Sequence, residues 1–153
     1  GRTLAVLGSG VDVIYPWENT KLAQDIVAHG ALGESLIHCA SHVMGSRPLN
    51  LQQLGVTIHD DPVAILPQAK ELIRQLDQGD GVLILTDVYG ASPCNTVCKI
   101  LRNREIEAIA GVNLPMLLKA LTYRDQGMAT LVEKAVAGGQ SGIFNVHSEP
   151  ARA

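Results

Sequence analysis

Polar side chains that could hold an anion follow a short apolar run near the middle of the chain. The run Val82–Leu85 has the character of a strand buried on both faces, and Thr86 and Asp87 come directly after it. Ser92 precedes a proline, the pattern of a helix cap followed by the first helical residue. A strand, a polar loop and a helix N-terminus are the parts of an anion site in an open α/β sheet. The competing interpretation is an ordinary, well-capped connection, since such connections are common.

The elements that would position these residues alternate along the chain. We expect strands at 3–7, 51–58, 82–85, 106–110 and 141–146, and helices at 33–44, 63–76, from 93, from 114 and at 128–137. This alternation predicts an α/β fold, a three-layer sandwich with a mostly parallel central sheet and helices on both faces. The length of 153 residues suits a single domain spanning residues 1–153.

The composition argues against several classes of protein. A net charge of −3 and the absence of a Lys or Arg run argue against a nucleic-acid surface. With no signal peptide and no apolar run of about 18 residues, we expect no membrane insertion and a cytoplasmic location. Cys39, Cys94 and Cys98 are odd in number and lack CxxC spacing, which fits a reduced compartment.

Other polar groups are weaker candidates. Glu34, His38 and His42 would share one helix face and could ligate a metal, but we favour a partly exposed polar face and expect no metal site. The His59–Asp61 run is interpreted as the start of a helix, with acids that favour its dipole. Asn113 precedes Leu-Pro and is predicted to cap the helix that follows, at the same sheet edge as Asp87.

Three motifs resemble the mannose-class enzyme IIA domain of the bacterial sugar phosphotransferase system. They are His29-Gly30 with a following GES helix, GVLILTDVYGASPCN at 81–95, and AIAGVNLPMLLKALTY at 108–123. They occur in the family's order and spacing, over about residues 26–146. The resemblance implies a phosphocarrier that accepts a phosphoryl group from HPr on a histidine and passes it to an enzyme IIB partner. It also implies a homodimer in which an antiparallel last strand is exchanged between subunits.

By the same resemblance, each site residue has a role. His29 would be the phosphoacceptor, Asp87 would orient its ring, and Ser92 would contact the phosphate. The remaining phosphate-binding or loop positions would be Thr86, Gly90, Ala91 and Asn113. The chemistry is consistent, because a neutral imidazole nitrogen can attack phosphorus while a carboxylate holds the other nitrogen. Positioning and charge stabilisation dominate such a transfer, so no metal or cofactor is expected.

The first 30 residues resemble a different family. The string GRTLAVLGSGVDVIYPWEN resembles the opening of the nucleotide-binding-like domain of the DNA-processing protein A (DprA) family. Residues 1–25 are therefore interpreted as a mosaic front that supplies a strand and a helix to an enzyme IIA-like body at 26–146, as in a chimera. None of the DprA family's DNA binding is carried over.

Two arrangements of this front are open. It could add a strand and a helix ahead of an intact enzyme IIA domain, whose first strand would end at residues 26–28, directly before His29. Alternatively, residues 4–7 replace a lost first strand and residues 18–28 form an inserted helix, which periodicity favours. His29 would then follow a helix, and phosphotransfer would be impaired. The alternative function is a regulatory or interaction protein that keeps the enzyme IIA fold.

Overall fold

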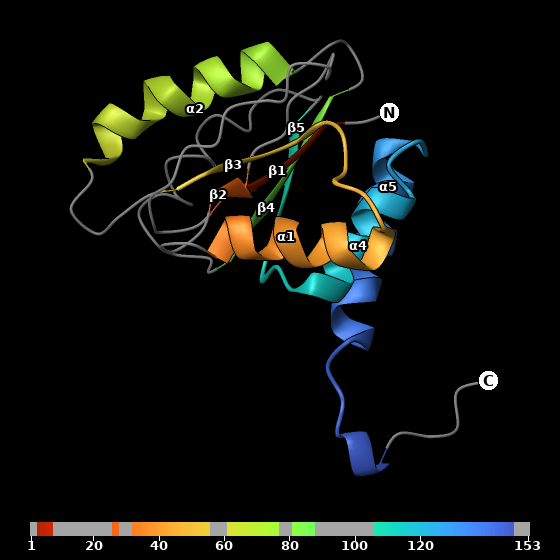
Figure 1. Cartoon of the computed structure of the whole chain (residues 1–153). Helices are drawn as coiled ribbons and strands as arrows, with labels where there is room; N and C mark the ends of the chain where they lie inside the picture. Colours follow the sequence, from red (N-terminus) through yellow and green to blue (C-terminus); the bar gives the residue numbers. More distant parts are fainter. Residues whose placement is uncertain are drawn as a thin grey trace.

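A parallel sheet lies at the centre of the molecule (Figure 1). The computed structural model describes residues 3–7, 26–27, 32–55, 61–76, 81–87 and 106–148. The strands are β1 (Thr3–Leu7), β2 (Ile26–Val27), β3 (Leu51–Leu54), β4 (Val82–Thr86) and β5 (Ile106–Ala110). Their order is β3-β1-β2-β4-β5, and β1 also pairs with β4. Every pairing is parallel, so the carboxyl ends of the strands meet at one edge.

Helices cover the sheet on both sides (Figure 1). They are α1 (Leu32–Met44), α2 (Pro62–Leu76), α4 (Leu114–Thr122) and α5 (Met128–Ser141), with a short 3-10 helix, η1 (Val146–Ser148). Helix α2 lies on one side of the sheet and α1 and α4 on the other. Leu83 and Leu85 of β4 share a buried cluster with Ile37, Leu117 and Leu131 of α1, α4 and α5. The predicted α/β fold with a parallel sheet and helices on both faces is confirmed.

The apolar patterns located most of the described elements correctly. Strand β4 is buried at every position, as its unbroken apolar run requires. Helix α1 ends where Gly45 takes a positive φ of 79°, a conformation that suits glycine after a helix. Strand β3 is shorter than the predicted 51–58, and residues 56–60 lie outside the described part of the chain.

The predicted last strand at 141–146 is not formed in the single chain. Helix α5 was expected to end at residue 137, yet it continues through Gly138 and Gly139 to Ser141. These glycines face helix α4, where a Cβ atom would meet Lys119 or Met116. They serve close packing between helices and do not terminate α5. Residues 143–145 have no regular structure, and η1 follows them.

The front of the chain combines parts of both predicted arrangements. Strand β1 pairs with β4 along its whole length, from Thr3 opposite Val82 to Leu7 opposite Thr86, and with β3 on its other side. It therefore occupies a central position in the sheet, as the replacement arrangement predicts. The predicted helix at 18–28 is wrong at its end, because Ile26–Val27 is a strand beside β4; residues 18–25 lie outside the described ranges. Backbone pairing to two neighbouring strands outweighs the helical periodicity there.

Candidate functional site

The end of β4 is joined to the loop after β5 by two backbone hydrogen bonds. Val112 N donates to Thr86 O and Gly111 N donates to Asp87 O, each at 3.0 Å. Gly111 has a φ of 86°, which a residue with a side chain rarely adopts, so glycine permits this loop path. The predicted juxtaposition of Asp87 with the Asn113 loop at one sheet edge is therefore present.

Thr86 presents an unusual buried hydroxyl at this edge. The residue is only 2 % exposed, and its Oγ1 has no hydrogen-bond partner. A buried polar group left unpaired costs about 1 to 3 kcal/mol, so such a group calls for an explanation. Asp87, one residue further along, is half-buried at the point where the strand leaves the sheet.

Strand β2 brings the chain to the same edge two residues before His29. Ile26 is opposite Leu85 and Val27 is opposite Thr86, in parallel register. His29 itself lies outside the described residues, as do Gly90, Ala91 and Ser92. Of the predicted site residues, the structure therefore describes Thr86, Asp87 and Asn113, and it bonds the backbone of Thr86 and Asp87 to the loop that leads into Asn113.

Asn113 caps helix α4, as predicted. Its backbone is extended, with φ −136° and ψ 170°, and its Oδ1 accepts a hydrogen bond from Met116 N at 2.9 Å. Its Nδ2 donates to Gly139 O at 3.0 Å, which ties the start of α4 to α5. Asn113 thus fixes the loop beside Asp87 through both ends of its side-chain amide.

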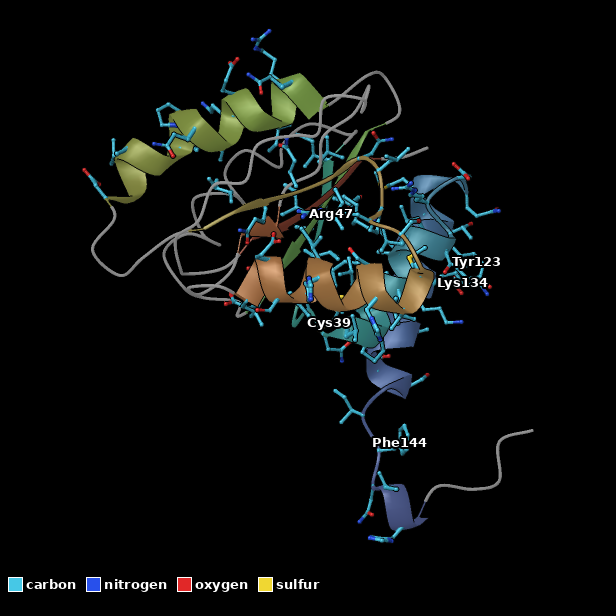
Figure 2. All side chains as sticks on the ribbon, viewed as in Figure 1. Cys39, Arg47, Tyr123, Lys134 and Phe144 are labelled. Atoms are coloured by element: carbon cyan, nitrogen blue, oxygen red, sulfur yellow. The ribbon has the colours of Figure 1, made fainter. Side chains whose placement is uncertain are left out.

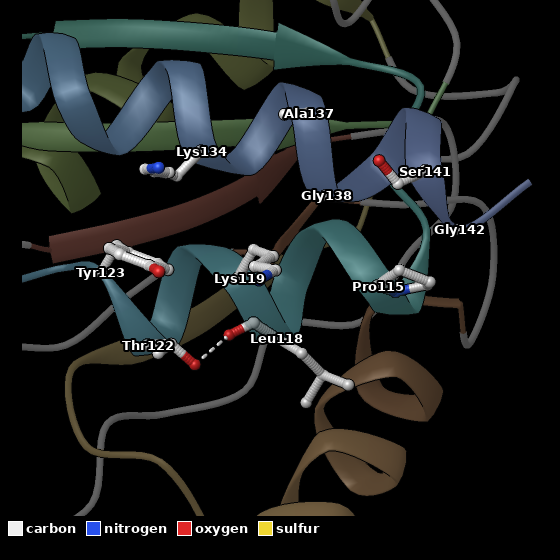
Figure 3. A pocket seen from close by; sticks show the side chains of 10 residues that line it. All are labelled: Pro115, Leu118, Lys119, Thr122, Tyr123, Lys134, Ala137, Gly138, Ser141 and Gly142. Atoms are coloured by element: carbon white, nitrogen blue, oxygen red, sulfur yellow. Dashed lines mark hydrogen bonds between the residues drawn. The ribbon is translucent and has the colours of Figure 1, made fainter. Parts of the chain in front are cut away.

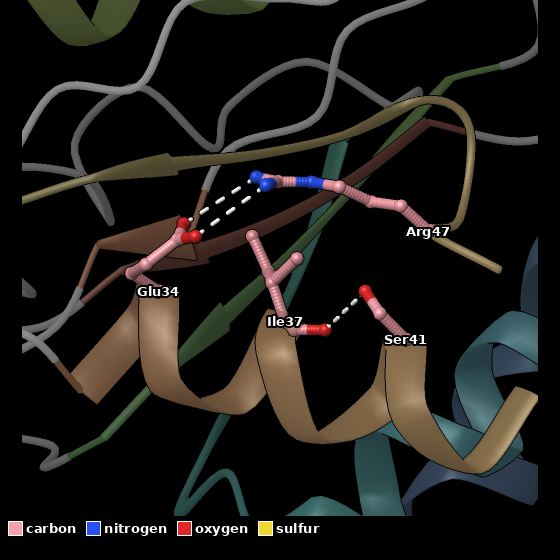
Figure 4. A network of polar contacts seen from close by, with 4 residues as sticks. All are labelled: Glu34, Ile37, Ser41 and Arg47. Atoms are coloured by element: carbon pink, nitrogen blue, oxygen red, sulfur yellow. Dashed lines mark hydrogen bonds and ion pairs between the residues drawn. The ribbon is translucent and has the colours of Figure 1, made fainter. Parts of the chain in front are cut away.

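The face of α1 that was considered as a metal site carries Glu34, and this residue pairs with an arginine (Figure 4). Arg47 NH1 and NH2 donate to Glu34 Oε1 and Oε2, each at 3.4 Å, which joins the start of α1 to the loop after it. His38 and His42 are exposed. Among the described residues, no three His, Cys, Asp or Glu side chains gather as metal ligands would. The Glu34 to Arg47 pair is not evident from the sequence, because the two residues are 13 positions apart and Arg47 lies in the irregular loop after α1.

The loop before α2 is a helix start, as predicted for its acidic residues. Asp61 Oδ1 accepts a hydrogen bond from Val63 N at 3.0 Å. His59 and Asp60 lie outside the described ranges. As for membrane crossing, no helix in the described part of the chain is both long and apolar enough to span a bilayer.

The open parallel sheet with polar groups at its carboxyl edge defines an α/β domain, and ligands of such domains commonly bind at that edge. The chain belongs to the family described as PTS system fructose IIA component (EIIA-man), which matches residues 26–136. It is 31 % identical over 128 residues to the PTS system mannose-specific EIIAB component of Escherichia coli strain K12, covering 82 % of this chain and 39 % of that protein. The chain thus spans well under half of that relative.

Two further similarities concern the fold and a shorter stretch. The mannose/sorbose specific IIA subunit of the phosphotransferase system from Enterococcus faecalis has a similar fold, with a TM-score of 0.71. The two chains are 18 % identical, and the match covers 88 % of this chain and 100 % of that one. Separately, 48 residues are 42 % identical to the protein Smf of Synechocystis sp., covering 31 % of this chain and 11 % of that protein.

Proposed function

We propose that the protein is a phosphocarrier of the sugar phosphotransferase system, with His29 as the phosphoacceptor. It would accept the phosphoryl group from HPr and pass it to an enzyme IIB partner. Membership of the EIIA-man family supports this role. The observation that carries the proposal for this chain is the register of β2, which pairs Val27 with Thr86 at the edge where Asp87 lies.

The chemistry proposed at this edge needs few groups. One imidazole nitrogen of His29 attacks the phosphorus of phospho-HPr, and the bond from phosphorus to HPr breaks as HPr leaves. The Asp87 carboxylate accepts the N–H of the other His29 nitrogen and holds the ring. The Ser92 hydroxyl and the N–H groups of the loop through Gly90 and Ala91 donate to the phosphoryl oxygens. The unpartnered Thr86 hydroxyl supports a polar occupant at this position. No cofactor or metal has a part in this mechanism.

The experiment is phosphorylation from labelled phosphoenolpyruvate in the presence of enzyme I and HPr. The unchanged protein is expected to carry one acid-labile phosphate, and His29→Ala is expected to carry none. His38→Ala, at an exposed position on α1, is the matched control and keeps the label. Label that persists in His29→Ala would reject the assignment. Protein partners that bind His29→Ala unchanged, without any label, would instead indicate the regulatory function.

We also propose that the protein is a homodimer joined through its C-terminal segment, residues 143–148. This segment extends away from the body, with Phe144 on it (Figure 2). Ile143 and Val146 are each 76 % exposed. Strand β5 ends the sheet order, and an edge strand offers backbone groups to which a strand from a second copy can pair. Formation of a strand by residues 143–146 would then depend on the partner.

Finally, we infer that residues 1–25 have a DprA-like origin and that residues 26–146 form the enzyme IIA-like body. The central place of β1 between β3 and β4 supports a front that has become part of the fold. A chain lacking residues 1–25 is therefore expected to lose cooperative unfolding, measured by circular dichroism. A truncated chain that unfolds with the full chain's cooperativity and midpoint would overturn the inference that residues 1–25 have become part of the fold.

A further inference from the structure

A hollow of about 610 Å³ lies between α4 and α5 (Figure 3). This volume is in the range of pockets that take small molecules. Its polar lining comes from Lys119 and Thr122 of α4, Tyr123 at the end of that helix, and Lys134 and Ser141 of α5. It shares no residue with the candidate site at Thr86, Asp87 and Asn113.

Two ammonium groups are held at one aromatic ring in this hollow. The Nζ atoms of Lys119 and Lys134 lie 5.6 Å and 5.5 Å from the centre of the Tyr123 ring. Cation–π attraction acts at these distances and draws both side chains toward the ring. The two charges repel each other, and the lining contains no acidic residue. Within the described part of the chain, neither lysine forms an ion pair with a carboxylate.

The position of Lys119 is further restricted by Gly138. A Cβ atom at residue 138 would overlap Lys119 Cγ and lie 2.8 Å from Lys119 Cβ, so the lysine stem occupies the space that a side chain there would fill. A charged group whose stem is already packed loses less conformational freedom when it binds a ligand. The hollow thus holds positive charge in place on a protein whose net charge is −3.

The remaining lining indicates the kind of anion. Pro115, Leu118 and Ala137 add apolar surface beside the two lysines. Thr122 Oγ1 donates to Leu118 O at 2.8 Å, so its oxygen remains able to accept a hydrogen bond. A phosphate monoester carries close to two negative charges at neutral pH, which matches the two ammonium groups. Lysine binds phosphate as a point charge.

We propose that the hollow between α4 and α5 binds a small organic phosphate. The phosphate lies between Lys119 and Lys134, and the compact organic part lies over the apolar residues. This site is separate from the phosphocarrier site, and it does not require His29 to be phosphorylated.

Binding to the full, unphosphorylated chain is measured by isothermal titration calorimetry and by the NMR shifts of the Tyr123 ring protons. The probes are glucose 6-phosphate, inorganic phosphate and glucose. We expect saturable binding of glucose 6-phosphate at millimolar concentration, weaker binding of inorganic phosphate and none of glucose. Added salt is expected to weaken the binding. Because HPr and enzyme I are absent, the result is independent of whether His29 accepts a phosphoryl group.

A double variant, Lys119→Gln with Lys134→Gln, tests the two charges. Both lysines are exposed, so the fold is expected to be kept, and affinity for glucose 6-phosphate is expected to fall by about tenfold or more. Lys70→Gln is the matched control, since Lys70 is exposed on α2 across the sheet, and its affinity should equal that of the unchanged chain. No saturable binding, or equal affinity in the double variant, would overturn the proposal. Equal affinity for inorganic phosphate would overturn the organic class of the ligand.

Discussion

Asn113 connects three parts of the molecule through one side chain. Its amide oxygen caps α4, its amide nitrogen binds the backbone of α5, and its own loop is bonded to the end of β4 through Val112 and Thr86. The loop beside Asp87 is therefore held by contacts that lie outside the loop itself. A candidate site built in this way is positioned before any ligand arrives.

Asn113→Ala should lower the free energy of unfolding by about 1 to 2 kcal/mol, because a helix cap and a partly buried hydrogen bond are lost together. Urea unfolding followed by circular dichroism measures this change. Asn145→Ala is the comparison, since Asn145 Oδ1 also accepts a backbone N–H, from His147, but in the exposed C-terminal segment. A loss for Asn113→Ala no larger than that for Asn145→Ala would contradict the proposed positioning role.

At the candidate site, the sequence predicted those features that depend on neighbouring residues along the chain, namely a helix cap and the end of a buried strand. The position of Asn113 before a Leu-Pro pair was enough to predict its cap, and an unbroken apolar run predicted that Asp87 would follow a buried strand. The bond from Asn113 to Gly139 could not be predicted, because it depends on how α5 packs. The unpartnered hydroxyl of Thr86 was likewise invisible in the sequence, since burial at a strand end is a tertiary property.

Helix α5 depends on glycines for its close approach to α4. Cβ atoms at Gly138, Gly139 and Gly142 would meet Lys119, Met116 and Pro115, all on α4. From the sequence alone, Gly138-Gly139 predicts a helix end, because glycine is a poor helix former in isolation. Tertiary packing overrode that preference. The strand expected at 141–146 also conflicts with this packing, because α5 continues to Ser141.

Gly138→Ala tests helix propensity against helix packing, because the two effects change the free energy of unfolding in opposite directions. Helix propensity alone would stabilise the alanine variant by about 1 kcal/mol. The contact with Lys119 Cβ, an atom fixed to the α4 backbone, forces the helices apart and costs about 1 to 3 kcal/mol. We expect a net loss of stability in urea unfolding. Gly127→Ala, where nothing lies within 4 Å, should change stability by clearly less, and a stabilised Gly138→Ala would contradict the packing role.

At the scale of the whole molecule, the exposed C-terminal segment and the edge strand β5 both support a second copy as partner. The chain has a mass of 16.3 kDa, so sedimentation equilibrium should give about twice that value for the proposed dimer. Replacing both Ile143 and Val146 by Asp should give a monomer, because charges would be buried between the subunits. Val63→Asp, on an equally exposed residue of α2, should leave the dimer intact. A monomeric unchanged chain, or a double variant that remains dimeric, would refute the proposed dimer.

The order of the strands was the hardest feature to predict. Hydrophobic patterns located β1, β4 and β5. They could not decide whether β1 or the residues before His29 would lie next to β4, because that depends on pairing across the sheet, and both segments pair with β4. Two residues, Ile26 and Val27, keep a strand beside β4 although the preceding pattern is helical. The pairing of Ile26 and Val27 with β4 supports the proposed site, because it brings the chain to the sheet edge beside Asp87 two residues before His29.

The rate of phosphoryl transfer from phospho-HPr to this protein tests whether His29 and Asp87 act together. In a rapid-quench experiment the unchanged chain should be phosphorylated on His29, and Asp87→Asn should slow that transfer by about 10- to 100-fold, because the ring loses the carboxylate that orients it. His42→Ala, on the exposed face of α1, should transfer at the unchanged rate. Equal rates for Asp87→Asn and the unchanged chain, or no transfer to either, would contradict the proposed site.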